Sequence, residues 1–120
     1  MSTYATIGIM NREDCSVTAS QVKWDGGLRC VGRTLLQHYN TEEKARELIS
    51  LGNVDSLYPT IEETKASTNH KFMGGKPVTT KNGEHWEEGE YNYLWLFGEW
   101  RLCSSVSLKE CYKYSLDENR

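Results

Sequence analysis

Residues 22–39 read Val-Lys-Trp-Asp-Gly-Gly-Leu-Arg-Cys-Val-Gly-Arg-Thr-Leu-Leu-Gln-His-Tyr, and within this stretch a strand-like run becomes a helix. Asp25 and the two glycines that follow it are turn-forming residues, so they end the strand. After the turn, Val31 and Leu35 recur at helical spacing, which predicts a short amphipathic helix over residues 28–39. The two glycines therefore mark a corner between a sheet and a helix.

A β-hairpin is expected before this corner. Residues 4–10 alternate between apolar and polar positions, and residues 16–24 are rich in β-branched side chains. The polar, turn-forming residues 11–14 separate the two runs.

A second helix is expected after the corner, over residues 42–51. Thr41 precedes Glu42 and Glu43, which is typical of an N-cap followed by an acidic first turn. Gly52 then provides a C-terminal cap.

Residues 60–90 lose clear periodicity and contain glycines, a proline and many charges, which predicts a long, polar and mobile insertion. Within it, Asn82 and Gly83 are suited to the turn of a small hairpin. Lysines precede glutamates along the insertion, and such a bipolar arm can steer a charged protein surface into register. The alternative is a polar hairpin that folds on itself. The candidate partner-binding residues are Lys71, Lys76, Lys81, His85, Trp86, Glu87 and Glu88.

The C-terminal part predicts a second hairpin. Residues 91–97 form an almost continuous apolar run, which is typical of a central strand. Gly98 and Glu99 fit a two-residue turn, and residues 100–106 return as an alternating strand. Residues 108–116 favour a final amphipathic helix, although a short strand is an alternative.

Together these elements predict a single α+β domain over residues 1–120. Its core would be an antiparallel sheet of about four strands, made by the N-terminal and C-terminal hairpins. Two or three short helices would pack on that sheet, and residues 60–90 would lie outside it.

Several segments resemble a family of small uncharacterised proteins from bacteriophages and prophages. The shared segments are Trp24-Asp25-Gly26, Val31-Gly32, Leu35-Leu36, His38-Tyr39, residues 48–57, and Tyr91-Asn92-Tyr93-Leu94 followed by Trp100. They cover about half of the chain in the same order, whereas the central insertion has no counterpart. Residues 27–30 also depart from the aromatic and proline-containing turn that is usual in the family. The resemblance implies a phage setting and carries no activity with it.

Composition narrows the classes of partner. Fourteen basic and seventeen acidic residues give a formal net charge of −3, which does not favour non-specific binding to nucleic acid.

No window approaches the roughly 18 apolar residues of a membrane helix, and the N-terminus lacks the pattern of a secretory signal. We therefore expect a protein of the host cytoplasm.

The four cysteines form no Cys-x-x-Cys pair, so we expect reduced, buried or half-buried thiols.

The corner also fits the pattern of a phosphate-binding loop. Residues 27–34 match Gly-x-x-x-x-Gly-Lys-Thr, except that an arginine stands at the lysine position. The surroundings lack the repeated strand-helix-strand order of nucleotide hydrolases, so we do not expect hydrolysis. A helix N-terminus with two arginines remains a candidate site for one phosphate-like anion. Its residues are Gly27, Arg29, Gly32 and Arg33. In the alternative the corner is structural, with Trp24 in the core and Asp25 capping the turn.

No catalytic constellation, metal site or cofactor motif is predicted. His38, His70 and His85 lack the spacing of metal ligands, and a charged loop around His85 does not hold the geometry of a general base. The favoured function is a non-enzymatic phage-type protein that binds and inhibits or redirects a host protein, for example an anti-defence or anti-CRISPR inhibitor. Such a partner would belong to a defence or nucleic-acid-processing complex. The alternatives are a small-anion or nucleotide binder and a nucleic-acid-binding module, and the oligomeric state stays open.

Overall fold

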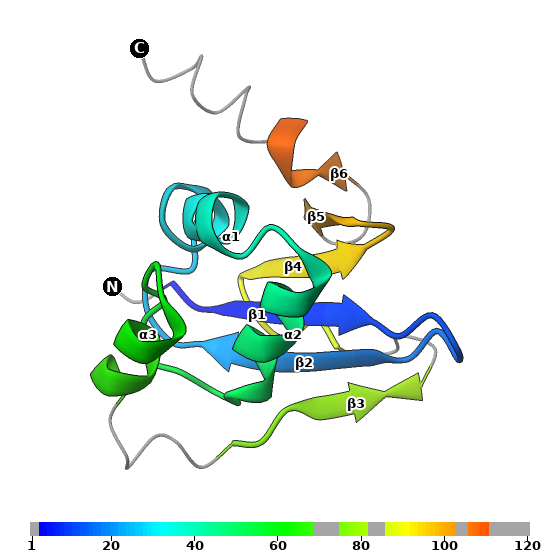
Figure 1. The fold of residues 1–120 in the computed structure, drawn as a ribbon, viewed down its shortest axis with the longest axis horizontal. Helices are drawn as coiled ribbons and strands as arrows, with labels where there is room; N and C mark the ends of the chain where they lie inside the picture. The colour runs from blue at the N-terminus through cyan, green and yellow to red at the C-terminus, as the bar shows by residue number, and fades with distance from the viewer. Residues whose placement is uncertain (1–2, 69–74, 82–85, 103–105, 111–120) are drawn as a thin grey trace.

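The computed structural model describes residues 3–68, 75–81, 86–102 and 106–110, and it shows a compact α+β fold (Figure 1). In these residues six strands form one mixed sheet in the order β3-β2-β1-β4-β5-β6. The strands are β1 (Ala5–Met10), β2 (Val17–Val22), β3 (Val78–Thr80), β4 (Tyr91–Leu96), β5 (Glu99–Leu102) and β6 (Val106–Ser107).

The helix after the corner is confirmed. A π-helical turn, η1 (Leu28–Gly32), runs directly into α1 (Arg33–His38). Asp25 has a positive φ of 57°, and its carbonyl accepts a hydrogen bond of 3.2 Å from the Val31 amide, so the corner is closed by backbone geometry.

The second predicted helix is α2 (Glu42–Ser50). The Thr41 side chain accepts a hydrogen bond of 3.2 Å from the Lys44 amide, which confirms the predicted N-cap. Gly52 has a φ of +84°, and the carbonyl oxygen of Gly75 occupies the place where a Cβ would lie. A glycine is therefore required there both as a helix cap and for this close approach.

The predicted antiparallel sheet of about four strands is confirmed within the two hairpins, but the described sheet has six strands and joins the hairpins through a parallel pair. β1 pairs with β2 in antiparallel fashion but with β4 in parallel fashion, with Ile7 opposite Tyr93. Hydrophobic pattern cannot distinguish the two directions, because both give the same alternation of side chains. The long crossover between β1 and β4 carries the helices and permits the parallel pair. The predicted central position of β4 is confirmed, since it lies between β1 and β5.

Residues 60–90 are predicted to lie outside the sheet, but in the structure one part of them joins the sheet and another part is helical. They contain α3 (Ile61–Ser67), whose N-cap Thr60 accepts a hydrogen bond of 3.1 Å from the Glu63 amide. They also contain β3, which pairs with β2 so that Ala19 lies opposite Val78. Asn82 and Gly83 lie outside the described residues.

The C-terminal hairpin is confirmed, but its turn is displaced by one residue. Leu96 pairs with Glu99, so the two turn residues are Phe97 and Gly98, with φ of 53° and 78°. Two successive positive φ angles are the mark of a type I′ turn, which matches the twist of the strands. Residues 108–110 are helical, and the remainder of the predicted final helix lies outside the described chain.

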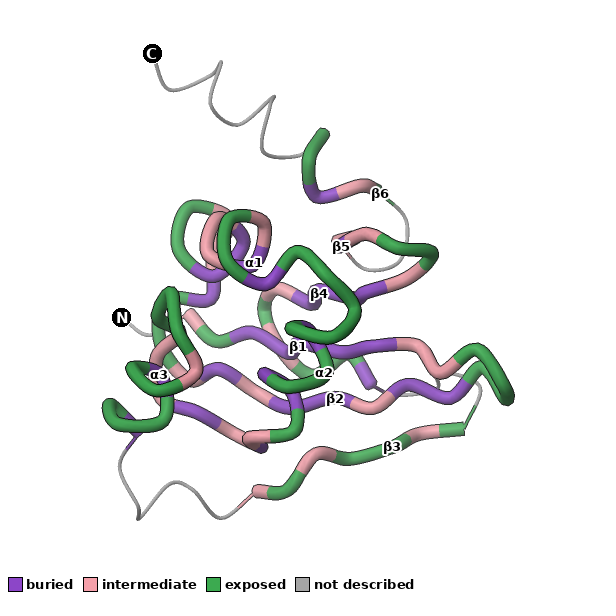
Figure 2. The backbone as a smooth tube through the Cα atoms, viewed as in Figure 1, coloured by how far each residue is buried: buried purple, intermediate pink, exposed green. Residues whose placement is uncertain are grey.

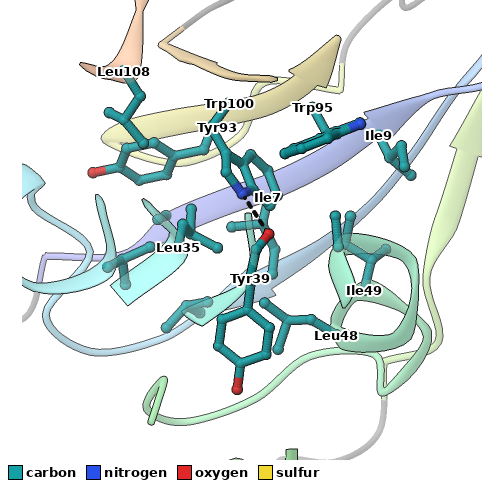
Figure 3. Close-up of a cluster of buried hydrophobic side chains, with 14 of the residues drawn as sticks. Ile7, Ile9, Leu35, Tyr39, Leu48, Ile49, Tyr93, Trp95, Trp100 and Leu108 are labelled. Carbon is teal, nitrogen blue, oxygen red and sulfur yellow. Dashed lines mark hydrogen bonds between the residues drawn. The ribbon is translucent and has the colours of Figure 1, made fainter. Parts of the chain in front are cut away.

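The main hydrophobic core lies between the sheet and the helices α1 and α2 (Figures 2 and 3). Trp100 is 1% exposed, and its indole Nε1 donates a hydrogen bond of 2.9 Å to the Tyr39 carbonyl. This bond joins the C-terminal hairpin to the end of α1 (Figure 3). Trp24 was expected in this core but is 41% exposed, with the Lys23 ammonium 5.1 Å from its ring centre.

No helix of the described residues is both long and apolar enough to cross a membrane.

Candidate functional site: the second face of the sheet

The sheet has two faces with different coverings. Alternate residues of β1, including Ile7 and Ile9, face the main core under the helices. The intervening residues Thr6, Gly8 and Met10 face the opposite side, which we call the second face. The described helices lie on the first side only (Figure 1).

Trp86 covers the centre of the second face. It is 5% exposed and forms a small cluster with Val17, Ala19 and Leu94. A Cβ at Gly8 would lie 3.3 Å from Trp86 Cε3 and 2.9 Å from Val17 Cγ1, so the glycine leaves room for the indole. The sequence predicted Trp86 as a partner contact, whereas the structure buries it against the strands.

The residues after Trp86 are tied to the start of β1. The Glu88 amide donates a hydrogen bond of 3.3 Å to Thr6 Oγ1, and the Glu90 amide donates one of 3.0 Å to the Tyr4 carbonyl. The Tyr4 hydroxyl donates to the Glu88 carbonyl. The position of Glu88 is therefore set by the sheet rather than by a free arm.

A cavity of about 200 Å³ lies beside Trp86, next to β2 and β3. Trp86, Ala19 and Val78 give it an apolar wall, and Lys76 and Glu88 place opposite charges around it. The Gln21 side-chain amide donates a hydrogen bond of 2.7 Å to a carboxylate oxygen of Glu88. The arrangement suits binding, because an apolar surface is surrounded by oriented polar groups.

The structure brings together only part of the predicted partner-binding set. Lys76, Trp86 and Glu88 line this cavity, while Lys81 and Glu87 are exposed nearby in the chain. Lys71 and His85 lie outside the described residues.

The predicted anion-binding residues do not form a loop. Gly27 precedes the helix, and its carbonyl accepts hydrogen bonds from the amides of Cys30 and Gly32, at 3.1 and 3.2 Å. Gly32 is buried inside the continuous helix, while Arg29 is exposed and Arg33 is half-buried. A phosphate-wrapping loop precedes the helix, whereas residues 28–32 here are themselves helical, so the match in spacing is not accompanied by the loop of that motif. The binding of one anion by the helix N-terminus with Arg29 and Arg33 stays a prediction.

Asp14 and Tyr39 have displaced pKa values, and neither residue lines the cavity. Hydrogen bonds from the Ser16 hydroxyl and amide lower the pKa of Asp14, which lies in the β1–β2 turn. Burial raises the pKa of Tyr39, whose hydroxyl donates a hydrogen bond of 2.7 Å to the Tyr58 carbonyl.

Metal chemistry has no support in the described part of the chain, where no group of three His, Cys, Asp or Glu side chains is close enough to hold an ion. His38 is exposed at the end of α1.

Cys15 and Cys30 are free thiols and are exposed, contrary to the expectation of burial.

Eight of the eleven residues that line the cavity are absent from the predicted partner-binding set, among them Thr6, Gln21 and Asn53. Thr6, Gln21 and Asn53 come from β1, from β2 and from the loop after α2. The Asn53 side-chain oxygen accepts a hydrogen bond of 2.9 Å from the Gln21 backbone amide, and these two residues are far apart in the sequence. No local pattern signals such a contact. Comparisons of the chain with models of known protein families, with curated proteins and with solved structures find no match.

Proposed function

We propose that this protein is a non-enzymatic, phage-type accessory protein that binds a host protein in the cytoplasm and inhibits or redirects it. Anti-defence inhibition, for example of a CRISPR complex, is the most concrete form of this proposal. The observation that supports it is the pair of opposite charges at the cavity on the second face, Lys76 and Glu88. Lys81 and Glu87 are exposed nearby in the chain, and we call these four residues the charged rim.

The surface at the cavity combines an exposed apolar side chain with charged ones. Val78 is 62% exposed beside the cavity, and charged side chains surround it. Protein interfaces combine an apolar centre with a polar rim, in which charges set the orientation of the partner. Hydrogen bonds to Gln21 and Thr6 hold Glu88 in place, so this residue loses little conformational entropy on binding.

The rim also indicates the chemistry of the partner. The two lysines flank β3, whereas the two glutamates follow Trp86. A partner with acidic and basic groups in the complementary order would be selected, and a uniformly anionic nucleic acid would be repelled by the glutamates. We therefore favour a protein of a defence or nucleic-acid-processing complex over the nucleic acid itself.

Reversal of the lysine charges tests the proposal. The variant Lys76→Glu with Lys81→Glu should weaken binding of the captured host protein by about tenfold, mainly through slower association. The matched control is Lys44→Glu with Lys65→Glu, which makes the same change of charge on exposed positions of α2 and α3. Affinity capture from host extract, treated with nuclease, identifies the partner, and association kinetics then compare the variants.

The proposal is contradicted if the wild-type chain captures no host protein, or if the two double variants bind equally well. If the host protein is captured without nuclease but is lost after nuclease treatment, the nucleic-acid-binding alternative is favoured.

A further inference from the structure

Phe97 is the most exposed large apolar side chain of the described residues, with 82% of its surface accessible. It lies at the tip of the hairpin between β4 and β5. Gly98, beside it, has open space where a Cβ would lie, so the tip stands clear of the rest of the molecule.

The backbone of this turn is unsuited to phenylalanine. Phe97 has a φ of +53°, in the left-handed region that favours glycine, asparagine and aspartate. Type I′ turns accordingly prefer Asn-Gly, and here phenylalanine stands where asparagine is favoured. Backbone strain and exposure of an aromatic ring thus coincide at one residue, and neither contributes to folding. Such a coincidence is typical of residues that serve a function.

The surroundings of Phe97 indicate which surface it contacts. β1 and β4 are parallel, with Ile9 opposite Trp95, so the β1–β2 turn emerges at the same end of the sheet as Phe97 (Figure 1). That turn carries the exposed carboxylates Glu13 and Asp14. Its arginine, Arg12, lies 3.5 Å from a carboxylate oxygen of Glu42.

This end of the sheet carries charges of both signs. Arg46 donates a hydrogen bond of 3.0 Å to Asn11 of the same turn, and Lys81 follows β3, whose Thr80 lies opposite Val17. A uniformly negative surface, such as nucleic acid or anionic lipid, matches only the basic part of this set. A protein pocket with an apolar interior and charges of both signs at its margin matches the ring and its surroundings.

The geometry points to Phe97 as an aromatic anchor that inserts into an apolar pocket of the protein partner, with charged residues of both signs at the margin of that pocket. The inference deepens the proposed function and rests on it for the existence of that partner. Anchors of this kind dominate the energy of an interface, because a rigid aromatic side chain is fully desolvated in the complex. The hairpin presents the ring without a further loss of backbone freedom.

Photo-crosslinking tests the contact directly. The photoreactive analogue p-benzoylphenylalanine replaces Phe97 in the full chain, and the same analogue at Tyr58 serves as the control. Tyr58 is 41% exposed and belongs to the loop before α3, away from the hairpin tip. After irradiation in host extract, we expect the analogue at position 97 to give one adduct with the captured host protein, whereas the control gives none.

A second measurement uses Phe97→Asn, which relieves the strain and removes the ring. We expect the thermal unfolding temperature to be unchanged or raised, while binding of the captured protein falls at least twentyfold. Tyr58→Asn, the matched control, should leave binding unchanged.

The outcomes separate the two proposals. If Phe97→Asn captures the host protein as well as the wild-type chain does, the anchor is overturned and the proposed function stands. The same follows if the host protein is captured but the analogue at position 97 gives no adduct with it. A crosslinked dimer in the purified protein alone also overturns the inference, because the ring then contacts a second copy. Absence of any captured host protein overturns both.

Discussion

The two faces of the sheet are covered in different ways. On the first face, α1 and α2 bury a large cluster that includes Leu35, Leu48 and Tyr93. On the second face, the cover within the described residues is the side chain of Trp86 and the small cluster around it. Figure 2 shows the buried strands between the exposed outer surfaces of the helices and the exposed β3 edge.

We propose that the first face provides stability and that the second face provides recognition. Burial of apolar area is the main source of folding free energy, so the helix-covered face provides most of it. Within the described residues the second face has a smaller apolar cluster, a cavity and charged side chains, and this is the surface that we propose contacts a partner. The following substitutions test this division, from the largest expected effect to the smallest.

Trp100→Ala should give the largest loss of stability, because it empties the helix-covered core and removes the hydrogen bond to Tyr39. The Trp95 ring, whose centre lies 5.6 Å away, also loses its edge-on partner. We expect the free energy of unfolding to fall by about 4 kcal/mol. Urea denaturation followed by circular dichroism measures it. Trp24→Ala, at an exposed tryptophan, should cost about 0.5 kcal/mol, and equal losses at the two positions would contradict this assignment of the core.

Trp86→Ala tests the second face and should cost about 3 kcal/mol, at the low end for a buried aromatic. Gly8→Ala should cost roughly 1–3 kcal/mol, because its Cβ would press on Trp86 and Val17. In the double variant the Gly8→Ala cost should shrink by roughly 1 kcal/mol, since one of the two clashes is gone. Strict additivity in denaturant melts would show that Trp86 does not pack on Gly8.

Tyr39→Phe tests the attachment of α3 on the helix-covered face. The Tyr39 hydroxyl donates to the Tyr58 carbonyl, and Thr64 Oγ1 lies 3.5 Å from it. Loss of this hydroxyl should cost about 1 kcal/mol.

The same variant should change the alkaline stability profile. Burial raises the pKa of Tyr39 above its ordinary 10.0, so the unfolded chain loses this proton first. The contribution of Tyr39 is therefore complete below pH 10 and is lost as pH rises through the folded-state pKa. Urea melts between neutral and alkaline pH should show a steeper decline for wild type than for Tyr39→Phe, and parallel profiles would contradict the assigned pKa shift.

Asp14→Asn should have the smallest effect, because this residue lies in an exposed turn outside both clusters. Hydrogen bonds from Ser16 lower the pKa of Asp14, so its stabilising contribution is present above the ordinary value of 3.8. That contribution is lost as pH falls through the folded-state pKa. Wild type should be slightly more stable than Asp14→Asn at neutral pH, and the difference should disappear in acid. A difference that persists at low pH would place its cause elsewhere.

Local elements were predictable because their signals lie within a few residues. The Thr41 cap, the acidic first turn and Gly52 define α2, and the structure agrees within one residue. Thr60 followed by Glu63 is a capping-box pattern, which likewise marks the start of α3. The many other charges of residues 60–90 obscure this pattern in the sequence.

The candidate site was predictable only in part. Lys76 and Glu88 belong to the predicted partner-binding set, and the structure places both at the cavity, whereas it buries Trp86 against the sheet. A tryptophan among charges carries no local sign of burial, because the space that accepts it is made by Gly8, which is distant in the sequence.

By itself the sequence determined the α+β class, both hairpins and the first two helices, since these depend on periodicity, turn residues and caps. Only the tertiary structure decided the parallel pairing of β1 with β4, the addition of β3 to the sheet edge and the separate covers of its two faces. It also decided that Trp86 is buried while Phe97 is exposed. The physical reason is that each of these features depends on which distant segments meet, and hydrophobic pattern alone does not specify that pairing.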